Sequence, residues 1–232
     1  MSMAQVSKMF LNASLKGVTL DVGEQELALI NQFTMKTLTA EDVFVFKLAM
    51  CDNEIDRDIE QFSDECLTKL AELFKGRTVI SDHYATSKNQ SARIYDTEVE
   101  TTSDKNSLGQ PYKRLIAKCY MPVTKSNEDL ILEINAGIKK EVSVGVSIGK
   151  VQCSICGIDR RKQTCDHKLG AEYNKKKCHF ILCEPTDAYE VSFVAVPAQK
   201  QAGVIKSYEL NDQDVSKQLE IEKAKTEILS KM

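Results

Sequence analysis

The sequence predicts an α+β protein built around a β-barrel or a strongly bent sheet, with two or three helices placed between the strands. Two observations support this class. About six or seven segments are short, apolar and rich in β-branched or aromatic residues, which is typical of strands that can pair antiparallel. Two other segments carry the end signals and apolar spacing of amphipathic helices. No internal repeat is visible, and 232 residues suffice for one large domain with an insertion.

Most of the predicted helices and strands are bounded by residues typical of turns and helix ends. The segment VFVFKLAMC (43–51) reads as a buried strand that ends at an acidic turn. The next helix begins after the N-cap Ser63, carries acidic residues in its first turn and ends at Gly76. The later elements are a strand at 77–83, a hairpin of strands 91–101 and 112–121, a capped helix at 126–137, a strand at 141–149 and a strand at 188–198.

Domain organisation follows from where these patterns stop. Residues 1–42 form an N-terminal segment with a short helix around 24–32. Residues 43–204 form the main domain, interrupted at 151–183 by a Cys-rich insertion that breaks every periodicity. Residues 205–232 read as an exposed charged helix or tail.

Composition narrows the class of protein. The net charge is -3 and the isoelectric point is about 5.8, which argues against nucleic acid or an anionic membrane as the main partner. The sequence lacks a signal-peptide pattern and an apolar run of roughly 18 to 20 residues, so we expect a soluble, intracellular protein. Eight cysteines in such a protein do not indicate a disulfide framework, and five of them fall within 31 residues. This clustering favours metal binding.

The segment CSICGIDRRKQTCDH gives the spacing C-x2-C-x8-C-x-H, which suits a tetrahedral zinc ion. Four protein ligands leave no position for a water molecule, so the predicted Zn²⁺ is structural and not catalytic. The predicted ligands are Cys153, Cys156, Cys165 and His167, and the remaining alternatives are Cys178, His179 and Cys183.

The stretch EVSVGVSIGK raises the question of a serine nucleophile. Gly145 to Gly149 match the G-x-S-x-G pattern of hydrolases, which requires a helix directly after the serine. The following residues, KVQCSICG, do not form one, so the match at Ser147 is interpreted as accidental. Ser143 and Ser147 have the same parity on the strand, so periodicity alone does not choose between them.

Three segments together, in this order, resemble the tailed-phage prohead proteases. The first is the strand that leads into His83, the second places a Ser-x-Gly after a helix and a glycine turn, and the third is a late Glu-x-Ser-x-Val-x-x-Pro-Ala signature. The resemblance covers about residues 43–204. The matching positions are His83, Gly137, Ser143, Gly145, Glu190, Ser192, Val194, Pro197 and Ala198.

The resemblance implies a fold and a catalytic site. The fold would be that of the herpesvirus assemblins, a closed β-barrel of six or seven mostly antiparallel strands flanked by helices, here with a zinc-binding insertion. Ser143 would be the nucleophile, His83 the general base and Glu190 the carboxylate that orients the histidine. The assemblins use a second histidine in this third role, so His179 is a competitor, and Asp82 is another carboxylate close in sequence.

The resemblance also implies a biological role. The chain would be a capsid-maturation serine endopeptidase that cleaves the phage scaffold and the major capsid protein precursor inside the prohead, in the bacterial host cytoplasm. Self-association into a homo-oligomer is compatible with this role. The alternative is a noncatalytic, zinc-stabilised capsid- or scaffold-interacting protein with the same fold. A metallohydrolase is disfavoured because the sequence has no H-E-x-x-H motif.

Overall fold

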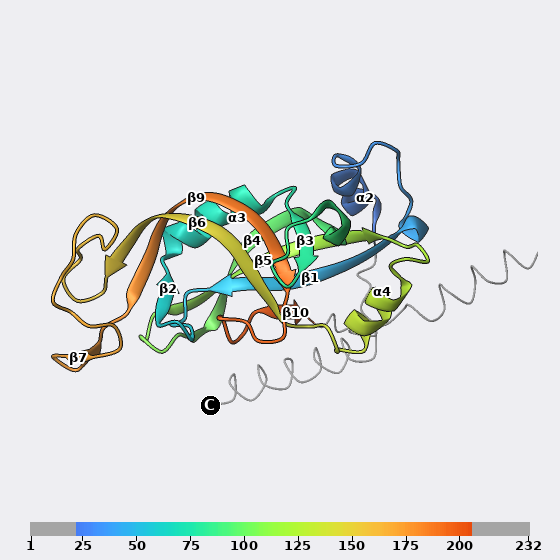
Figure 1. Ribbon diagram of the computed structural model, residues 1–232. Helices are drawn as coiled ribbons and strands as arrows, with labels where there is room; N and C mark the ends of the chain where they lie inside the picture. Colours follow the sequence, from blue (N-terminus) through green and yellow to red (C-terminus); the bar gives the residue numbers. More distant parts are fainter. Residues whose placement is uncertain (1–21, 206–232) are drawn as a thin grey trace, which may run out of the picture.

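The structure is a computed structural model that describes residues 22–205. An eight-stranded mixed sheet dominates this part of the chain, and three α-helices accompany it (Figure 1). The strands of this sheet are β1 (Val43–Asp52), β2 (Glu60–Phe62), β3 (Thr78–Ser81), β4 (Ala92–Lys105), β5 (Pro111–Pro122), β6 (Val142–Cys153), β9 (Phe180–Phe193) and β10 (Gly203–Ile205). The helices are α2 (Glu24–Asn31), α3 (Asp64–Phe74) and α4 (Glu128–Asn135), with 3-10 turns η1 (Ala40–Asp42) and η2 (Ser87–Asn89), and a separate hairpin is formed by β7 (Glu172–Tyr173) and β8 (Lys176–Lys177).

The prediction of a closed barrel is wrong, because the sheet is open. Its strand order is β10-β1-β5-β4-β3-β9-β2, and β6 pairs with β9 alone. The two margins of the sheet approach each other at one isolated bridge, between Glu141 and Gly203, and no ladder continues from it in residues 22–205. The barrel does not close because β10 is only three residues long and can pair with little of β6. The rest of β6 pairs with β9, and the two strands extend together away from the sheet toward β7 (Figure 1).

Most strand pairs of the sheet are antiparallel, as expected, but β9 also has parallel neighbours. β9 pairs antiparallel with β6 along one margin, whereas β2 and β3 both pair parallel with it. β3 joins β9 at Thr78 to Ser81, so the chain leaves β3 beside the end of β9. This arrangement brings the residue that follows β3 to the same end of the sheet as Ser143.

Helix α3 forms as its end signals predict. The Ser63 side chain accepts a hydrogen bond from the Cys66 N–H at 3.1 Å, and Gly76 takes a φ of +80° just after the last turn. Cys66, Leu67, Leu70 and Phe74 are buried on the face that packs against β4, β5 and β9. Burial of this apolar stripe anchors the helix to the sheet.

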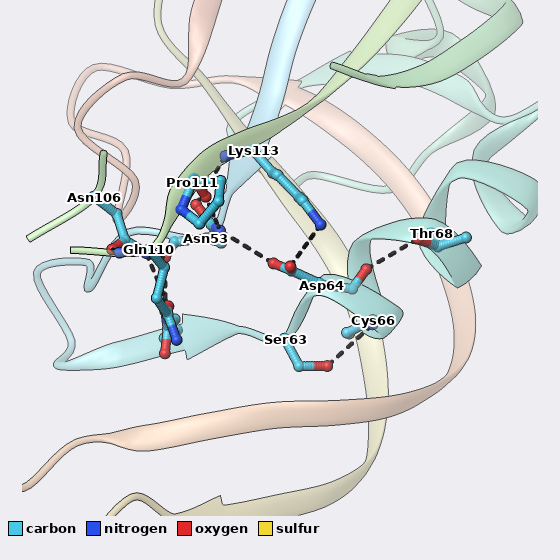
Figure 2. A network of polar contacts seen from close by, with 10 residues as sticks. Asn53, Ser63, Asp64, Cys66, Thr68, Asn106, Gln110, Pro111 and Lys113 are labelled. Atoms are coloured by element: carbon cyan, nitrogen blue, oxygen red, sulfur yellow. Dashed lines mark hydrogen bonds and ion pairs between the residues drawn. The ribbon is translucent and has the colours of Figure 1, made fainter. Parts of the chain in front are cut away.

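A buried polar network fixes the loop after β1. Figure 2 shows the Asn53 side chain donating to Asp64 Oδ1 at 3.1 Å and to the Pro111 carbonyl at 2.9 Å. Its own oxygen accepts the Lys113 N–H at 3.0 Å, and the Lys113 ammonium reaches Asp64 Oδ2 at 2.6 Å. One buried side chain therefore ties the end of β1 to α3 and to the β4–β5 hairpin.

Candidate active site and metal centre

His83 lies on a two-residue turn directly after β3. Asp82 and His83 both have left-handed backbones, with φ of 55° and 53°, a conformation that costs residues other than glycine on the order of 1 kcal/mol or more. Two bonds to β9 hold this turn. The Asp82 N–H donates to the Phe193 carbonyl at 2.9 Å, and the His83 N–H donates to Ser192 Oγ at 2.8 Å.

The turn directs the His83 ring toward Glu190. His83 Nδ1 and Glu190 Oε1 are 2.8 Å apart. The Glu190 side chain is 8% exposed, whereas the His83 side chain is 44% exposed, so the carboxylate lies beneath a ring that solvent can reach. A carboxylate accepts hydrogen bonds, which assigns the hydrogen of the neutral ring to Nδ1 and leaves Nε2 as the free base.

Gly145 makes room for this carboxylate. Glu190 and Gly145 are paired across β6 and β9. A Cβ added to Gly145 would overlap Glu190 Oε1 and lie 3.1 Å from its Cδ. The other carboxylate oxygen, Oε2, is buried and has no hydrogen-bond partner in the described part of the chain. Glycine at this strand position is therefore a condition for the buried carboxylate.

Ser143 lies beside these groups. It pairs with Ser192 across β6 and β9, two residues before the pair of Gly145 and Glu190. Directly opposite strand residues have Cβ atoms about 5 Å apart and share one face of the sheet. The Ser143 hydroxyl is partly exposed and forms no hydrogen bond within residues 22–205. Ser143, Glu190 and Ser192 thus lie on one face, with His83 bonded to the latter two.

Ser147 does not form a nucleophile elbow. Strand β6 runs without a break through both serines, and Ser147 pairs with Asp187, whose carboxylate is bonded to Arg77 at 2.8 Å. The two glycines of the G-x-S-x-G match have another explanation. A Cβ on Gly149 would lie 2.7 Å from the Glu184 carbonyl, so both glycines allow the backbone and side chains of β9 to approach.

His179 and Asp82, the two alternatives to Glu190 as the group that orients the histidine, do not bind His83 within the described residues. His179 is at the opposite end of β9 from Ser192, about 40 Å away along the strand at 3.3 Å per residue. Its Nε2 is 3.3 Å from Oε1 of the buried Gln61, whose side-chain amide donates to the Asn53 carbonyl at 2.7 Å. Asp82 is exposed, and its carboxylate bonds no residue within the described range.

Two open hollows lie near the turn that carries His83, one lined by Glu190 and the other by Asp82 and Tyr84. One has a volume of about 390 Å³ and is lined by Arg77, Thr78, Ile80, Arg93, Tyr189 and Glu190. The other, of about 860 Å³, is lined by Ser81, Asp82, Tyr84, Thr86, Lys88 and Asn89.

The predicted metal ligands come together at the end of the β6–β9 arm. One donor atom from each of Cys153, Cys156, Cys165 and His167 lies within 4.8 Å of the others. Cys153 ends β6 and is buried, and Gly157 has a φ of +76° and donates its N–H to the Cys153 carbonyl at 2.9 Å. This tight turn is what places the first two sulfur atoms side by side.

The donor set fits a metal ion. Burial acts to raise the pKa of the Cys153 thiol, but the N–H groups of Cys156 and Ile155 outweigh it and lower this pKa to about 7. His167 Nδ1 is buried and has no hydrogen-bond partner in the described part of the chain, as a ligand atom would be before metal binding. Among the alternatives, Cys178 Sγ lies 3.9 Å from Cys153 Sγ, whereas His179 is bonded to Gln61.

The contacts of three residues at these sites are not predicted from the sequence. Arg160 donates to the Cys165 carbonyl at 3.0 Å and lies 3.1 Å from its sulfur, which supports the ligand loop. Gly145 and Ser192 have roles that depend on the pairing of β6 with β9. The sequence indicates Gly145 and Ser192 only through the spacings Ser-x-Gly and Glu-x-Ser.

Comparison with protein families, with curated proteins and with solved structures found no match to this chain. No helix among residues 22–205 is long and apolar enough to cross a membrane.

Proposed function

We propose that this chain is a serine endopeptidase in which Ser143, His83 and Glu190 act together. The observation that carries the proposal is the bond of 2.8 Å between His83 and the buried Glu190, on the face of the sheet that also bears Ser143. A serine hydroxyl needs a base to take its proton, and the base needs a third group to hold its tautomer.

The roles follow from this arrangement. The Ser143 oxygen attacks the scissile carbonyl while its proton passes to His83 Nε2, and the His83 imidazolium is stabilised by the Glu190 carboxylate at Nδ1. The same proton then passes to the leaving amine as the carbon–nitrogen bond breaks, which leaves an acyl group on Ser143. Water hydrolyses this ester with His83 again acting as base.

The substrates are proposed from the resemblance to prohead proteases. They are the phage scaffold and the major capsid protein precursor, cleaved inside the prohead in the host cytoplasm. The two open hollows near the His83 turn, one lined by Glu190 and the other by Asp82 and Tyr84, support a ligand at this end of the sheet.

Structural zinc is the metal proposed for the Cys153, Cys156, Cys165 and His167 cluster. Three sulfur donors and one nitrogen donor are typical of zinc, and four protein ligands close its coordination. The cluster lies at the end of the β6–β9 arm, away from Ser143, so the ion would supply stability to the ligand loop and no step of the reaction.

The experiment that tests the peptidase is active-site labelling with a fluorophosphonate, which needs no knowledge of the substrate. The expected result is one label per chain, located on Ser143 by peptide mass spectrometry and lost in the His83→Ala variant. Co-expression with scaffold and capsid proteins, followed by mass spectrometry of their termini, then tests the substrates. An absence of label on the folded, zinc-loaded wild type would overturn the peptidase and favour the noncatalytic capsid-interacting alternative.

A further inference from the structure

Ser192 is a hydroxyl residue in an otherwise apolar stretch of β9. Its exposed fraction is 0%, and its strand neighbours Val191 and Phe193 are buried as well. Burying a hydroxyl costs free energy unless it is hydrogen-bonded. Its oxygen accepts the main-chain N–H of His83 at 2.8 Å. A fully buried side chain cannot reach a substrate, so Ser192 is not a second nucleophile.

The residue it bonds has a strained backbone. Asp82 and His83 are consecutive left-handed residues, and neither is glycine. The bond that holds Asp82 ends on the Phe193 main-chain carbonyl and is independent of any side chain. The bond that holds the His83 N–H ends on the Ser192 side chain. Ser192 is therefore the side chain of β9 that binds the His83 main chain directly, while Asn89 binds the carbonyls of Ser81 and Tyr84 on either side of the turn.

Glu190 and Ser192 both form hydrogen bonds with His83, one to its ring and one to its main chain. They are two residues apart on β9 and so share one face of the sheet. Glu190 binds the ring at Nδ1, and Ser192 binds the main-chain nitrogen. A ring bound to one carboxylate can still shift with its main chain, whereas a second attachment at the main-chain nitrogen restrains the backbone from which the ring extends.

We propose that Ser192 is the positioning residue of His83, which keeps the imidazole in a single orientation between Glu190 and Ser143. Its effect on catalysis rests on the proposed function, whereas its effect on the His83 ring does not. The spacing Glu-x-Ser thus places both hydrogen-bond partners of His83 on the same face of β9. Ser192 acts through His83 and never touches substrate.

The test compares Ser192→Ala, which removes the acceptor, with Ser192→Thr, which retains a hydroxyl. Ser192→Cys, of similar size but a poor acceptor, serves as a second disruptive variant. The matched control is Thr97→Val, because Thr97 on β4 has a buried hydroxyl that donates to the Ala71 carbonyl of α3. All are examined as full-length, zinc-loaded chains, and folding is verified by circular dichroism.

The first readout is nitrogen-15 NMR of histidine-labelled protein. The chain has three histidines, so the His83 ring is assigned with one His83→Gln variant. Wild type, Ser192→Thr and Thr97→Val should show His83 as one tautomer with hydrogen on Nδ1. Ser192→Ala and Ser192→Cys should show a mixture of both tautomers.

The second readout is the kinetics of fluorophosphonate labelling. The maximal rate of labelling should fall by about 10- to 100-fold in Ser192→Ala, as expected for a misplaced catalytic group, with the half-saturating concentration within about twofold. Ser192→Thr should restore most of the rate. A wild-type ring and rate in both Ser192→Ala and Ser192→Cys would overturn the inference while leaving the peptidase intact. Wild type that is never labelled, with a ring that changes only in the Ser192 variants, would overturn the peptidase and support the positioning role.

Discussion

At the scale of single residues, the site depends on small side chains at specific places on one strand pair. Gly145 admits the Glu190 carboxylate, and Ser143 stands one pair further along on the same face. The two serines of β6 are chemically alike but have different neighbours. Ser143 faces Ser192, whereas Ser147 faces Asp187, whose carboxylate is occupied by Arg77.

This difference leads to a prediction for the two serines. Ser143→Ala should reduce the labelling and cleavage rates by about 10⁴- to 10⁶-fold, because it would remove the proposed nucleophile of the Ser-His unit. Ser147→Ala should retain most of both rates. Rates are measured by fluorophosphonate labelling and by cleavage of co-expressed capsid proteins. The opposite pattern would make Ser147 the nucleophile.

Gly145 gives a second prediction. Gly145→Ala places a methyl group where Glu190 Oε1 lies, so the carboxylate must leave His83. We expect a fall in the labelling rate of at least about 100-fold, comparable to the loss of an orienting carboxylate, with the fold retained. Gly23→Ala is the control, because a Cβ there meets nothing within 4 Å. Equal rates in the two variants would show that Glu190 does not need its present position.

At the scale of elements, the β6–β9 arm carries the metal site away from the rest of the sheet. The two strands pair as far as Cys153 and Phe180, so they extend into the segment predicted to lack periodicity. Beyond them, residues 154–179 contain only the two-residue strands β7 and β8. Ordering a residue costs about 1 to 2 kcal/mol, and this loop buries little apolar surface to offset it.

The metal prediction belongs to this element. We expect one zinc ion per chain, lost in Cys153→Ser and in Cys165→Ser, because apparent free energies of structural zinc binding are on the order of 10 to 16 kcal/mol. A chelator should make residues 154–179 sensitive to trypsin while the sheet remains protected. Metal analysis and mass spectrometry of the fragments check both points. Purified protein without zinc, or with a Cys153–Cys165 disulfide under reducing conditions, would contradict the prediction of a zinc site. Cys183→Ser, which should retain the zinc, is the matched control.

At the scale of the whole molecule, β9 is the strand on which the site is assembled. It lies between β3, which leads to His83, and β6, which carries Ser143. The large core beneath it includes three cysteines from other elements, Cys51, Cys66 and Cys119. Burial raises the pKa of all three thiols, that of Cys66 to about 12.

These thiols should therefore report global unfolding. At pH 7.5 the folded protein should leave Cys51, Cys66 and Cys119 unmodified by iodoacetamide, because the thiolate is the reactive form. Chelation should expose the thiols of the metal cluster only, and denaturant should expose all eight. Mass spectrometry of the alkylated peptides separates the two steps. Modification of Cys119 after chelation alone would show that the core depends on the metal.

Local signals were sufficient for part of this protein. The N-cap Ser63 and the glycine stop at Gly76 define α3, because capping depends on neighbours within one turn. The metal cluster is also local, since the four residues are close in sequence and one tight turn brings the first two together. The placement of His83 at a strand end follows from the pattern of residues 77–83.

Tertiary structure decided the remainder. The sequence contains strands that could close a barrel, but the actual pairing leaves the sheet open and places β3 parallel to β9. Pairing register between distant strands is not encoded by local propensity, and a shift of one residue would turn Glu190 to the other face, away from His83. The same register separates His179 from the site and makes Gly145 and Ser192 partners of Glu190 and His83. The sequence alone therefore determined which residues could do chemistry, and only the long-range pairing of β9 decided which of them meet.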